Sequence, residues 1–252
     1  GINDAIKTIH FPQELKDFKI ARKRLVFEEL LITQLSLMSL KNRDVLEEKG
    51  IKFSSEYKIE DFVKRFPFQL TNAQLRVLRE IEKDMESEKM MNRLLQGDVG
   101  SGKTAVAMSA AYKAVKSGYQ AAIMAPTAIL ATQHLENFDK MLTELGIKSA
   151  LLISGITKKK KEEILKNLKD GEIDILIGTH ALLEDNVEFK NLGLVVTDEQ
   201  HRFGVRQRNK IAKKGSNGQN PDVLVMSATP IPRTLALILY GDLDISIIDE
   251  LP

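Results

Sequence analysis

Residues 92–104 read NRLLQGDVGSGKT, and this stretch decides the fold. It begins as a short apolar run typical of a buried strand, and a helical pattern follows over residues 103–116. Between the two, residues 97–104 match the phosphate-loop pattern G-x-x-x-x-G-K-[ST]. The glycines allow backbone amides to point at phosphate oxygens, at the positive end of the following helix. The stretch therefore predicts a nucleotide-binding loop between a strand and a helix.

The residues of this loop divide the work of phosphate binding. Lys103 is expected to reach the β- and γ-phosphates, and the Thr104 hydroxyl to ligate Mg²⁺. The other loop residues predicted to bind the nucleotide are Gly97, Asp98, Val99, Gly100, Ser101 and Gly102. A chance match to the fixed positions is on the order of 1 in 100 for a chain of this length. Nucleotide binding is therefore preferred to a glycine-rich turn without a ligand.

Short apolar runs alternate with helical patterns along the rest of the chain. The strand-like runs are residues 93–96, 121–125, 150–153, 173–177, 192–197, 223–226 and 245–248. Helical patterns between them cover residues 103–116, 128–142 and 158–168. Alternation at this spacing predicts an α/β fold in which a parallel sheet is covered by helices on both faces.

The region before the phosphate loop is mostly helical by pattern. Residues 13–49 lack proline and internal glycine, and apolar side chains recur on more than one stripe, so we expect this helix to pack against other parts of the molecule. Gly50 is a plausible stop. Thr71 has the character of an N-cap for a further helix that runs to about residue 88.

Composition excludes several kinds of site. The 252 residues contain no cysteine, so thiol nucleophiles, disulfides and thiolate metal sites are absent. No two of the 4 histidines have the spacing of a metal pair, which leaves an oxygen-bound metal such as Mg²⁺. The net charge of +2 does not by itself indicate a polyanion partner. Without a signal peptide or an apolar run of roughly 20 residues, no membrane partner is expected and the chain is predicted to be cytoplasmic.

A pair of acids follows the apolar run at residues 192–197. Asp198 and Glu199 would lie at the carboxyl end of a buried strand, where ligands bind in open parallel sheets. Asp198 is expected to hold Mg²⁺, and Glu199 to orient and deprotonate the attacking water. An ordinary acidic loop is the alternative when the pair is considered without the phosphate loop.

Several strings carry a family resemblance. The sequence DEQH at residues 198–201 resembles the DEAH/DExH box of superfamily 2 helicases, and SAT at residues 227–229 resembles their motif III. The longer strings DEQHRFGVRQR at residues 198–208 and MSATPIPRTL at residues 226–235 resemble the RecG family of ATP-dependent DNA helicases. The strings IHFP at residues 9–12, LTNAQ at residues 70–74 and GDLD at residues 241–244 agree with it.

The resemblance implies a domain organisation. Residues 66–252 would form a RecA-like ATP-binding motor lobe, and residues 1–65 a helical linker to the DNA-binding wedge domain of the same parent chain. A second motor lobe, which carries the arginine finger, would lie outside these residues. The chain is thus expected to be a fragment that binds ATP but hydrolyses it weakly, because such an arginine is worth roughly 10³–10⁵ in rate.

The resemblance also implies further site residues. Gln74 would read the adenine, and Thr71 and the aromatic residues before it would support the base. A relay that couples the γ-phosphate to DNA would consist of His201, Ser227 and Thr229. Low-specificity contacts with the DNA backbone are expected from motif Ia and from motif Ib or Ic. These residues are Thr127, Gln133, Thr179 and His180, and His134 is either a further contact or a locally satisfied polar residue.

The function implied is an ATP-dependent DNA translocase that remodels branched DNA, such as stalled forks and Holliday junctions, in recombination and repair. Its cofactors would be ATP and Mg²⁺. Residues 202–214 contain six basic residues and no acid, which agrees with a DNA partner. An ordinary solvent-exposed surface is the alternative explanation for this basic stretch. The alternatives are the motor of a transcription-repair coupling factor and a nucleotide-gated DNA-binding module without motor activity.

Overall fold

The structure is a computed structural model of the 252 residues, and it describes residues 1–47, 50–198, 214, 219–228 and 243–252. Side chains in the first range are described up to residue 36. Contacts divide the chain into two compact units. One holds residues 1–47, and the other holds the described residues from 50 to 228 and from 243 to 252.

The first unit is a pair of helices, α1 (Ile2–His10) and α2 (Leu15–Glu47). Small buried residues, Ala5 on α1 and Ala21 on α2, allow the two backbones to approach. The long predicted helix is confirmed, whereas the sequence analysis did not predict α1. The large apolar side chains of α2, among them Phe27, Leu31 and Leu35, are exposed. Within the first unit, these side chains have no packing partner among the described residues.

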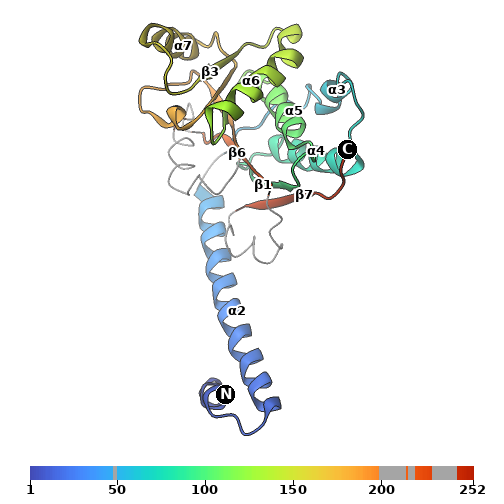
Figure 1. The fold of residues 1–252 in the computed structure, drawn as a ribbon, viewed down its shortest axis with the longest axis vertical. Helices are drawn as coiled ribbons and strands as arrows, with labels where there is room; N and C mark the ends of the chain where they lie inside the picture. Colours follow the sequence, from blue (N-terminus) through green and yellow to red (C-terminus); the bar gives the residue numbers. More distant parts are fainter. Residues whose placement is uncertain (48–49, 199–213, 215–218, 229–242) are drawn as a thin grey trace. The chain divides into compact units, whose positions relative to one another are not determined.

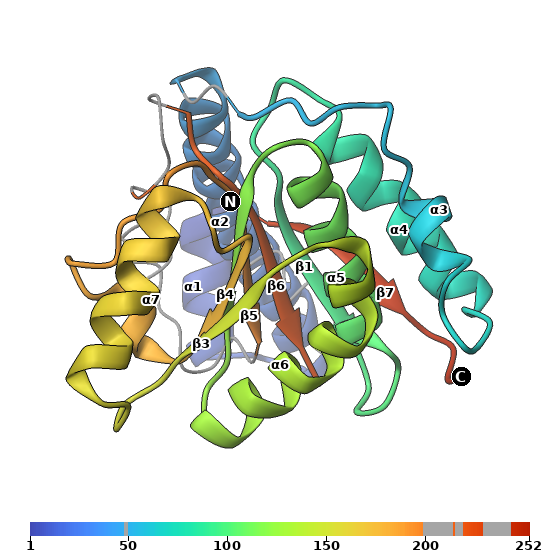
Figure 2. The same ribbon diagram turned by 90° about the horizontal axis from the view of Figure 1, so that it is seen from above.

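The second unit is built on a parallel sheet of seven strands, in the order β3-β4-β2-β5-β6-β1-β7 (Figures 1 and 2). The strands are β1 (Asn92–Gly97), β2 (Gln120–Met124), β3 (Ser149–Leu152), β4 (Ile175–Gly178), β5 (Leu192–Asp198), β6 (Asp222–Ser227) and β7 (Asp244–Ile248). Each of the predicted strands is found. All residues of β2, β4 and β6 are buried, which requires cover on both faces of the sheet. The α/β prediction is confirmed.

Among its described residues, the second unit has four helices longer than two turns. They are α4 (Asn72–Met85), α5 (Lys103–Lys116), α6 (Ala128–Leu142) and α7 (Lys158–Asp170). Helix α5 lies between α4 and α6 (Figure 2). The short elements are α3 (Ile59–Val63), η1 (Thr143–Leu145) and η2 (His180–Leu183). Predicted helix positions agree with these, and α4 ends at Met85 rather than near residue 88.

Residues 50–65, which the sequence analysis assigns to the linker, pack on the α/β unit. Ile51, Phe53, Ile59 and Phe62 belong to its buried core. The Phe62 ring stacks on that of Tyr112 in α5, with ring centroids 4.6 Å apart. Apolar burial of this kind is the main source of stability in a domain. The segment therefore holds α4 and α5 together from one side.

A buried cation joins the same elements. The Lys113 side chain on α5 is 0% exposed, and its Nζ donates to Oε1 of Glu82 on α4 at 3.1 Å and to Oε1 of Glu86, the C-cap residue of α4, at 2.7 Å. It also donates to the Tyr57 carbonyl oxygen at 3.0 Å. Burial raises the pKa of Glu86, but hydrogen bonds from Lys113 and Lys58 outweigh it and leave this pKa below its ordinary value. The cation thus fixes α4 against the helix that follows the phosphate loop.

Replacement of this cation tests the network. Lys113→Met should lower the free energy of unfolding by about 3 kcal/mol, because two partly buried carboxylates lose their shared partner. Urea unfolding of the chain at neutral pH measures this. The matched control is Lys58→Met, whose exposed ammonium binds the same Glu86 at 3.0 Å and should matter little.

The stabilisation that Lys113 gives through Glu86 should depend on pH. Because the folded-state pKa of Glu86 is lowered, its contribution is present at neutral pH and is lost as the pH falls through that value. The difference between Lys113→Met and the unaltered chain should therefore shrink in acid. A difference that grows as the pH falls would contradict the assignment.

Candidate nucleotide-binding site

The parallel sheet gathers distant motifs at one edge. Strands β5, β6 and β1 are neighbours, with Asp198 paired to Met226 and Gln96 paired to Ser227. Their carboxyl ends therefore bring together Asp198, the buried Ser227 and the loop that starts at Gly97. Ligands bind at this edge in open parallel sheets.

The phosphate loop has the backbone that its sequence predicts. Gly100 and Gly102 have φ values of 83° and 81°, a region that favours glycine, and α5 begins immediately afterwards at Lys103. The first amides of a helix have no intrahelical partner and point along the axis toward its N-terminus. An ideal Cβ on Gly102 would lie 2.2 Å from Nε2 of Gln74. The turn is thus closed against the Gln74 side chain, which would have to move to admit a larger residue at this position.

Lys103 and Ser101 place hydrogen-bond donors inside the loop. Nζ of Lys103 donates to the carbonyl oxygens of Gly97 at 2.7 Å and Asp98 at 2.8 Å. The Ser101 hydroxyl is buried and has no hydrogen-bond partner among the described residues. A buried orphan hydroxyl in a native structure calls for a bound polar partner. A cationic ammonium, helix amides and this hydroxyl make the loop suited to an anion such as a polyphosphate.

Gln74 connects the start of α4 to the loop. Its side chain is 1% exposed, its Nε2 donates to the Ser101 carbonyl oxygen at 2.8 Å, and its Oε1 accepts from Thr71 N at 2.8 Å. Thr71 caps α4 by accepting from Gln74 N, which confirms the predicted N-cap. Phe68, two residues before Leu70, is exposed and stacks on Phe66. An exposed aromatic face thus lies next to a capping box that touches the phosphate loop.

Asp198 and Thr104 provide oxygen donors of the type that Mg²⁺ prefers. The Asp198 carboxylate is partly buried, and its Oδ2 lies 2.9 Å from Nε2 of His134 on α6. Among the described residues no cluster of three or more acidic or histidine side chains could hold a metal by itself. One carboxylate and one hydroxyl fit a Mg²⁺ that receives its remaining ligands from phosphate oxygens and water. Glu199, His201 and Thr229 lie outside the described residues.

The residues predicted to contact DNA follow β2 and β4 at the same edge of the sheet. Thr127, which caps α6 by accepting from Leu130 N, is exposed, as are Gln133 and His180, and Thr179 is half-buried. His134 differs from them because it is buried and directed at Asp198. Of the basic stretch from residue 202, only Lys214 is described, and its Nζ donates to the carbonyl oxygens of Glu184 and Val187.

Sequence reasoning missed three contacts at the end of the chain. The Glu250 carboxylate accepts from Ala73 N at 3.1 Å, at the N-terminus of α4. Arg76 donates to Asp249 at 2.8 Å and to the Ile247 carbonyl oxygen at 3.0 Å. The partners are more than a hundred positions apart in sequence, and no local pattern could have revealed them.

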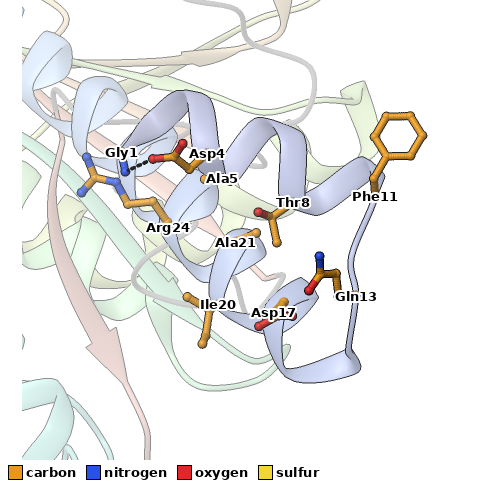
Figure 3. A pocket seen from close by; sticks show the side chains of 10 residues that line it. All are labelled: Gly1, Asp4, Ala5, Thr8, Phe11, Gln13, Asp17, Ile20, Ala21 and Arg24. Atoms are coloured by element: carbon orange, nitrogen blue, oxygen red, sulfur yellow. Dashed lines mark hydrogen bonds and ion pairs between the residues drawn. The ribbon is translucent and has the colours of Figure 1, made fainter.

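A cavity of about 600 Å³ lies in the first unit, between α1 and α2 (Figure 3). Its lining includes Asp4, which accepts from the N-terminal amino group, and Arg24. It contains none of the predicted site residues. Among the described residues there is no helix long and apolar enough to cross a membrane.

Comparison with known proteins agrees with the geometry. A model of the family described as DEAD/DEAH box helicase matches residues 71–238, which include the phosphate loop, Asp198 and Ser227. The chain belongs to the DEAD/DEAH box helicase family. The match begins at Thr71, the cap of the helix that carries Gln74.

Curated relatives extend the similarity within this helicase family. The chain is 53% identical over 250 residues to the ATP-dependent DNA helicase RecG of Bacillus subtilis (strain 168), covering 98% of this chain and 36% of that protein. It is 50% identical over 253 residues to the protein of the same name from Thermotoga maritima, covering 100% of this chain and 32% of that protein. The chain thus spans about a third of the length of these relatives.

Solved structures show the same arrangement. A structure of RecG bound to a three-way DNA junction is similar with a TM-score of 0.84 and 46% identity, over 98% of this chain and 33% of that one. The helicase MrfA bound to DNA and AMPPNP matches with a TM-score of 0.57 over 81% of this chain and 31% of that one. At 20% identity, the second match shows the fold alone.

Two glycines allow a matched test of the loop. Gly102→Ala should weaken nucleotide binding by at least tenfold, because the new Cβ meets Gln74 and disturbs the turn that presents the amides. Gly118→Ala is the control, since Gly118 has a similar φ of 88° and nothing lies within 4 Å of its ideal Cβ. Each change costs roughly 1 kcal/mol of backbone strain. Fluorescent-nucleotide titration should show weakening only for Gly102→Ala, and equal affinities would contradict the role of the loop.

Proposed function

We propose that this chain is the ATP-binding motor lobe of a RecG-type DNA helicase, which uses ATP hydrolysis to move on and remodel branched DNA. The observation that carries the proposal is the meeting of the phosphate loop and Asp198 at the carboxyl ends of β1 and β5, one strand apart. Similarity to RecG helicases over nearly the whole chain supports the type of motor.

The proposal includes a division of the parent protein. Residues 66–252 would be the first motor lobe, and residues 1–65 would link it to a DNA-binding wedge domain. The last part of this linker, residues 50–65, also packs into the core of the lobe. A second motor lobe would supply the arginine finger. The relatives are about three times as long as this chain, which supports the presence of a wedge domain and a second motor lobe in the same polypeptide.

The nucleotide would be held by the loop and the two oxygen donors. Lys103 and the first amides of α5 would bind the β- and γ-phosphates, and the Thr104 hydroxyl and Asp198 would hold Mg²⁺. Bound Mg²⁺ would supply charge neutralisation at the β- and γ-phosphate oxygens. Gln74 and the exposed face of Phe68 would receive the adenine, and the Gln74 amide would exchange its bond with Ser101 for the base.

Hydrolysis would depend on Glu199. Its carboxylate would accept a proton from the attacking water, whose oxygen forms a bond to the γ-phosphorus while the bond to the bridging oxygen breaks. ADP and inorganic phosphate are the products. His201, Ser227 and Thr229 would transmit the state of the γ-phosphate to the residues that meet the DNA backbone. Those residues are Thr127, Gln133, Thr179 and His180.

Two substitutions in the full-length protein test these roles. Lys103→Ala should abolish ATP binding or hydrolysis, whereas Glu199→Gln should bind ATP normally and hydrolyse it at least about 10²-fold more slowly. ATP turnover is measured with and without a three-way DNA junction, and nucleotide affinity separately. The control is Lys159→Ala, an exposed lysine on α7.

The outcomes separate the possible functions. Junction-stimulated turnover that both site variants lose supports the motor. Normal hydrolysis by Glu199→Gln would refute the general-base role. Binding of ATP and DNA without any turnover by the unaltered protein would favour a nucleotide-gated binding module, and specific capture of RNA polymerase would favour a transcription-repair coupling factor.

A further inference from the structure

His134 occupies an unusual place on α6. The buried residues of this helix are Ala131, His134, Phe138 and Leu142, which form one stripe at helical spacing. The other members of the stripe are apolar, and the His134 side chain is 6% exposed. A buried imidazole within an apolar stripe requires a polar partner. The partner in this structure is the carboxylate of Asp198, 2.9 Å away.

The direction of the hydrogen bond follows from the chemistry of the two groups. An ionised carboxylate only accepts, so Nε2 of His134 carries the hydrogen and donates it to Oδ2 of Asp198. Rotation of a carboxylate about its last torsion is soft, so its orientation depends on such partners. Among the described residues, no other hydrogen bond to this carboxylate is found. His134 therefore sets which way the Asp198 oxygens face.

Helix α6 also carries two of the residues that are proposed to contact DNA, Thr127 at its N-cap and Gln133. It begins directly after β2, the neighbour of β5, and its N-cap is the exposed Thr127. His134 follows Thr127 by seven positions, which is roughly 10 Å along a helix. Phe138 and Leu142, further along the same helix, lie fully buried in the core, and the hydrogen bonds between successive turns join the turns of a helix to one another. A displacement at the first turn of α6 would thus move the imidazole with it.

We propose that His134 is a positioning residue for Asp198, and that through it the engagement of DNA by the start of α6 is transmitted to the magnesium-binding carboxylate. This inference rests on the proposed function, because it takes Mg²⁺ as the ion at Asp198 and DNA as the ligand near Thr127. His134 itself is buried and would contact neither the nucleotide nor DNA. It links two sites that meet where β2 and β5 lie side by side.

The test uses two substitutions of one chemistry in the full-length protein. His134→Gln can place an amide N–H near the position of Nε2, whereas the shorter His134→Asn cannot. In the presence of a non-hydrolysable ATP analogue, Mn²⁺ affinity is measured by electron paramagnetic resonance. His134→Asn should weaken Mn²⁺ binding by about 10–100-fold, as is typical when the partner of a metal ligand is lost. His134→Gln should retain most of the affinity, as should Asn137→Ala, an exposed control on α6.

The second readout is the ratio of ATP turnover with and without a DNA junction at saturating Mg²⁺. The inference predicts a smaller ratio for His134→Asn and a restored ratio for His134→Gln, because a merely structural role would not distinguish the two amides in this way. Thermal unfolding checks that the variants fold. If His134→Asn does not fold, it is replaced by His134→Phe, which keeps an aromatic ring at this buried position but has no hydrogen-bond donor.

The outcomes distinguish this inference from the proposed function. If the unaltered protein shows DNA-stimulated turnover but the donor-lacking variant keeps both its Mn²⁺ affinity and its stimulation ratio, the inference is overturned and the proposed function stands. If the unaltered protein shows no DNA-stimulated turnover, the proposed function fails and the coupling fails with it. Mn²⁺ affinity then still decides whether His134 positions Asp198.

Discussion

Parallel pairing of the seven strands is the constraint on which the site depends. Parallel neighbours require a crossover between successive strands, and every strand then ends at the same edge of the sheet. The loop after β1, the acid after β5 and the serine at the end of β6 are far apart in sequence but adjacent there. Hydrogen bonds between neighbouring strands fix the register of the sheet. The strand ends therefore place these residues next to one another.

The packing of α4 on α5 is the second requirement. The phosphate loop is closed on one side by Gln74, and Gln74 is placed by the capping box that starts α4. Helix α4 in turn is held by Lys113 and by the aromatic stack of Phe62 on Tyr112. Removal of one partner from a buried ion pair of this kind is strongly destabilising, because the other charge is left without compensation. The position of the nucleotide base is thus set from outside the loop.

Local patterns in the sequence predict much of this structure. The strands, the phosphate loop and the Thr71 cap are each encoded by neighbouring residues, since apolar runs, glycine spacing and caps act over a few positions. Contacts between distant segments were not predictable in this way. Lys113 shows no signal in sequence for its two glutamates, and neither does Glu250 for the start of α4. Residues 50–65 look polar and linker-like, although four of their apolar side chains complete the core.

His134 and Gln133 show most clearly what the sequence can and cannot predict about the site. The sequence predicts a DNA contact for Gln133 and leaves two roles open for His134, because both residues follow the same strand. The stripe of Ala131, Phe138 and Leu142 was already visible in the sequence and places His134, not Gln133, on the buried face. What the stripe could not show was the partner, since Asp198 reaches His134 only through the pairing of β2 with β5.

The position of the bound metal tests the proposed nucleotide site most directly. Crystals of the full-length protein with Mn²⁺ and a non-hydrolysable ATP analogue would locate the ion by anomalous scattering. The account predicts one peak within about 2.2 Å of the Thr104 hydroxyl oxygen, on the side of the loop that faces Asp198, with phosphates at the first amides of α5. A metal and nucleotide bound elsewhere, with Thr104 and Asp198 uninvolved, would contradict it.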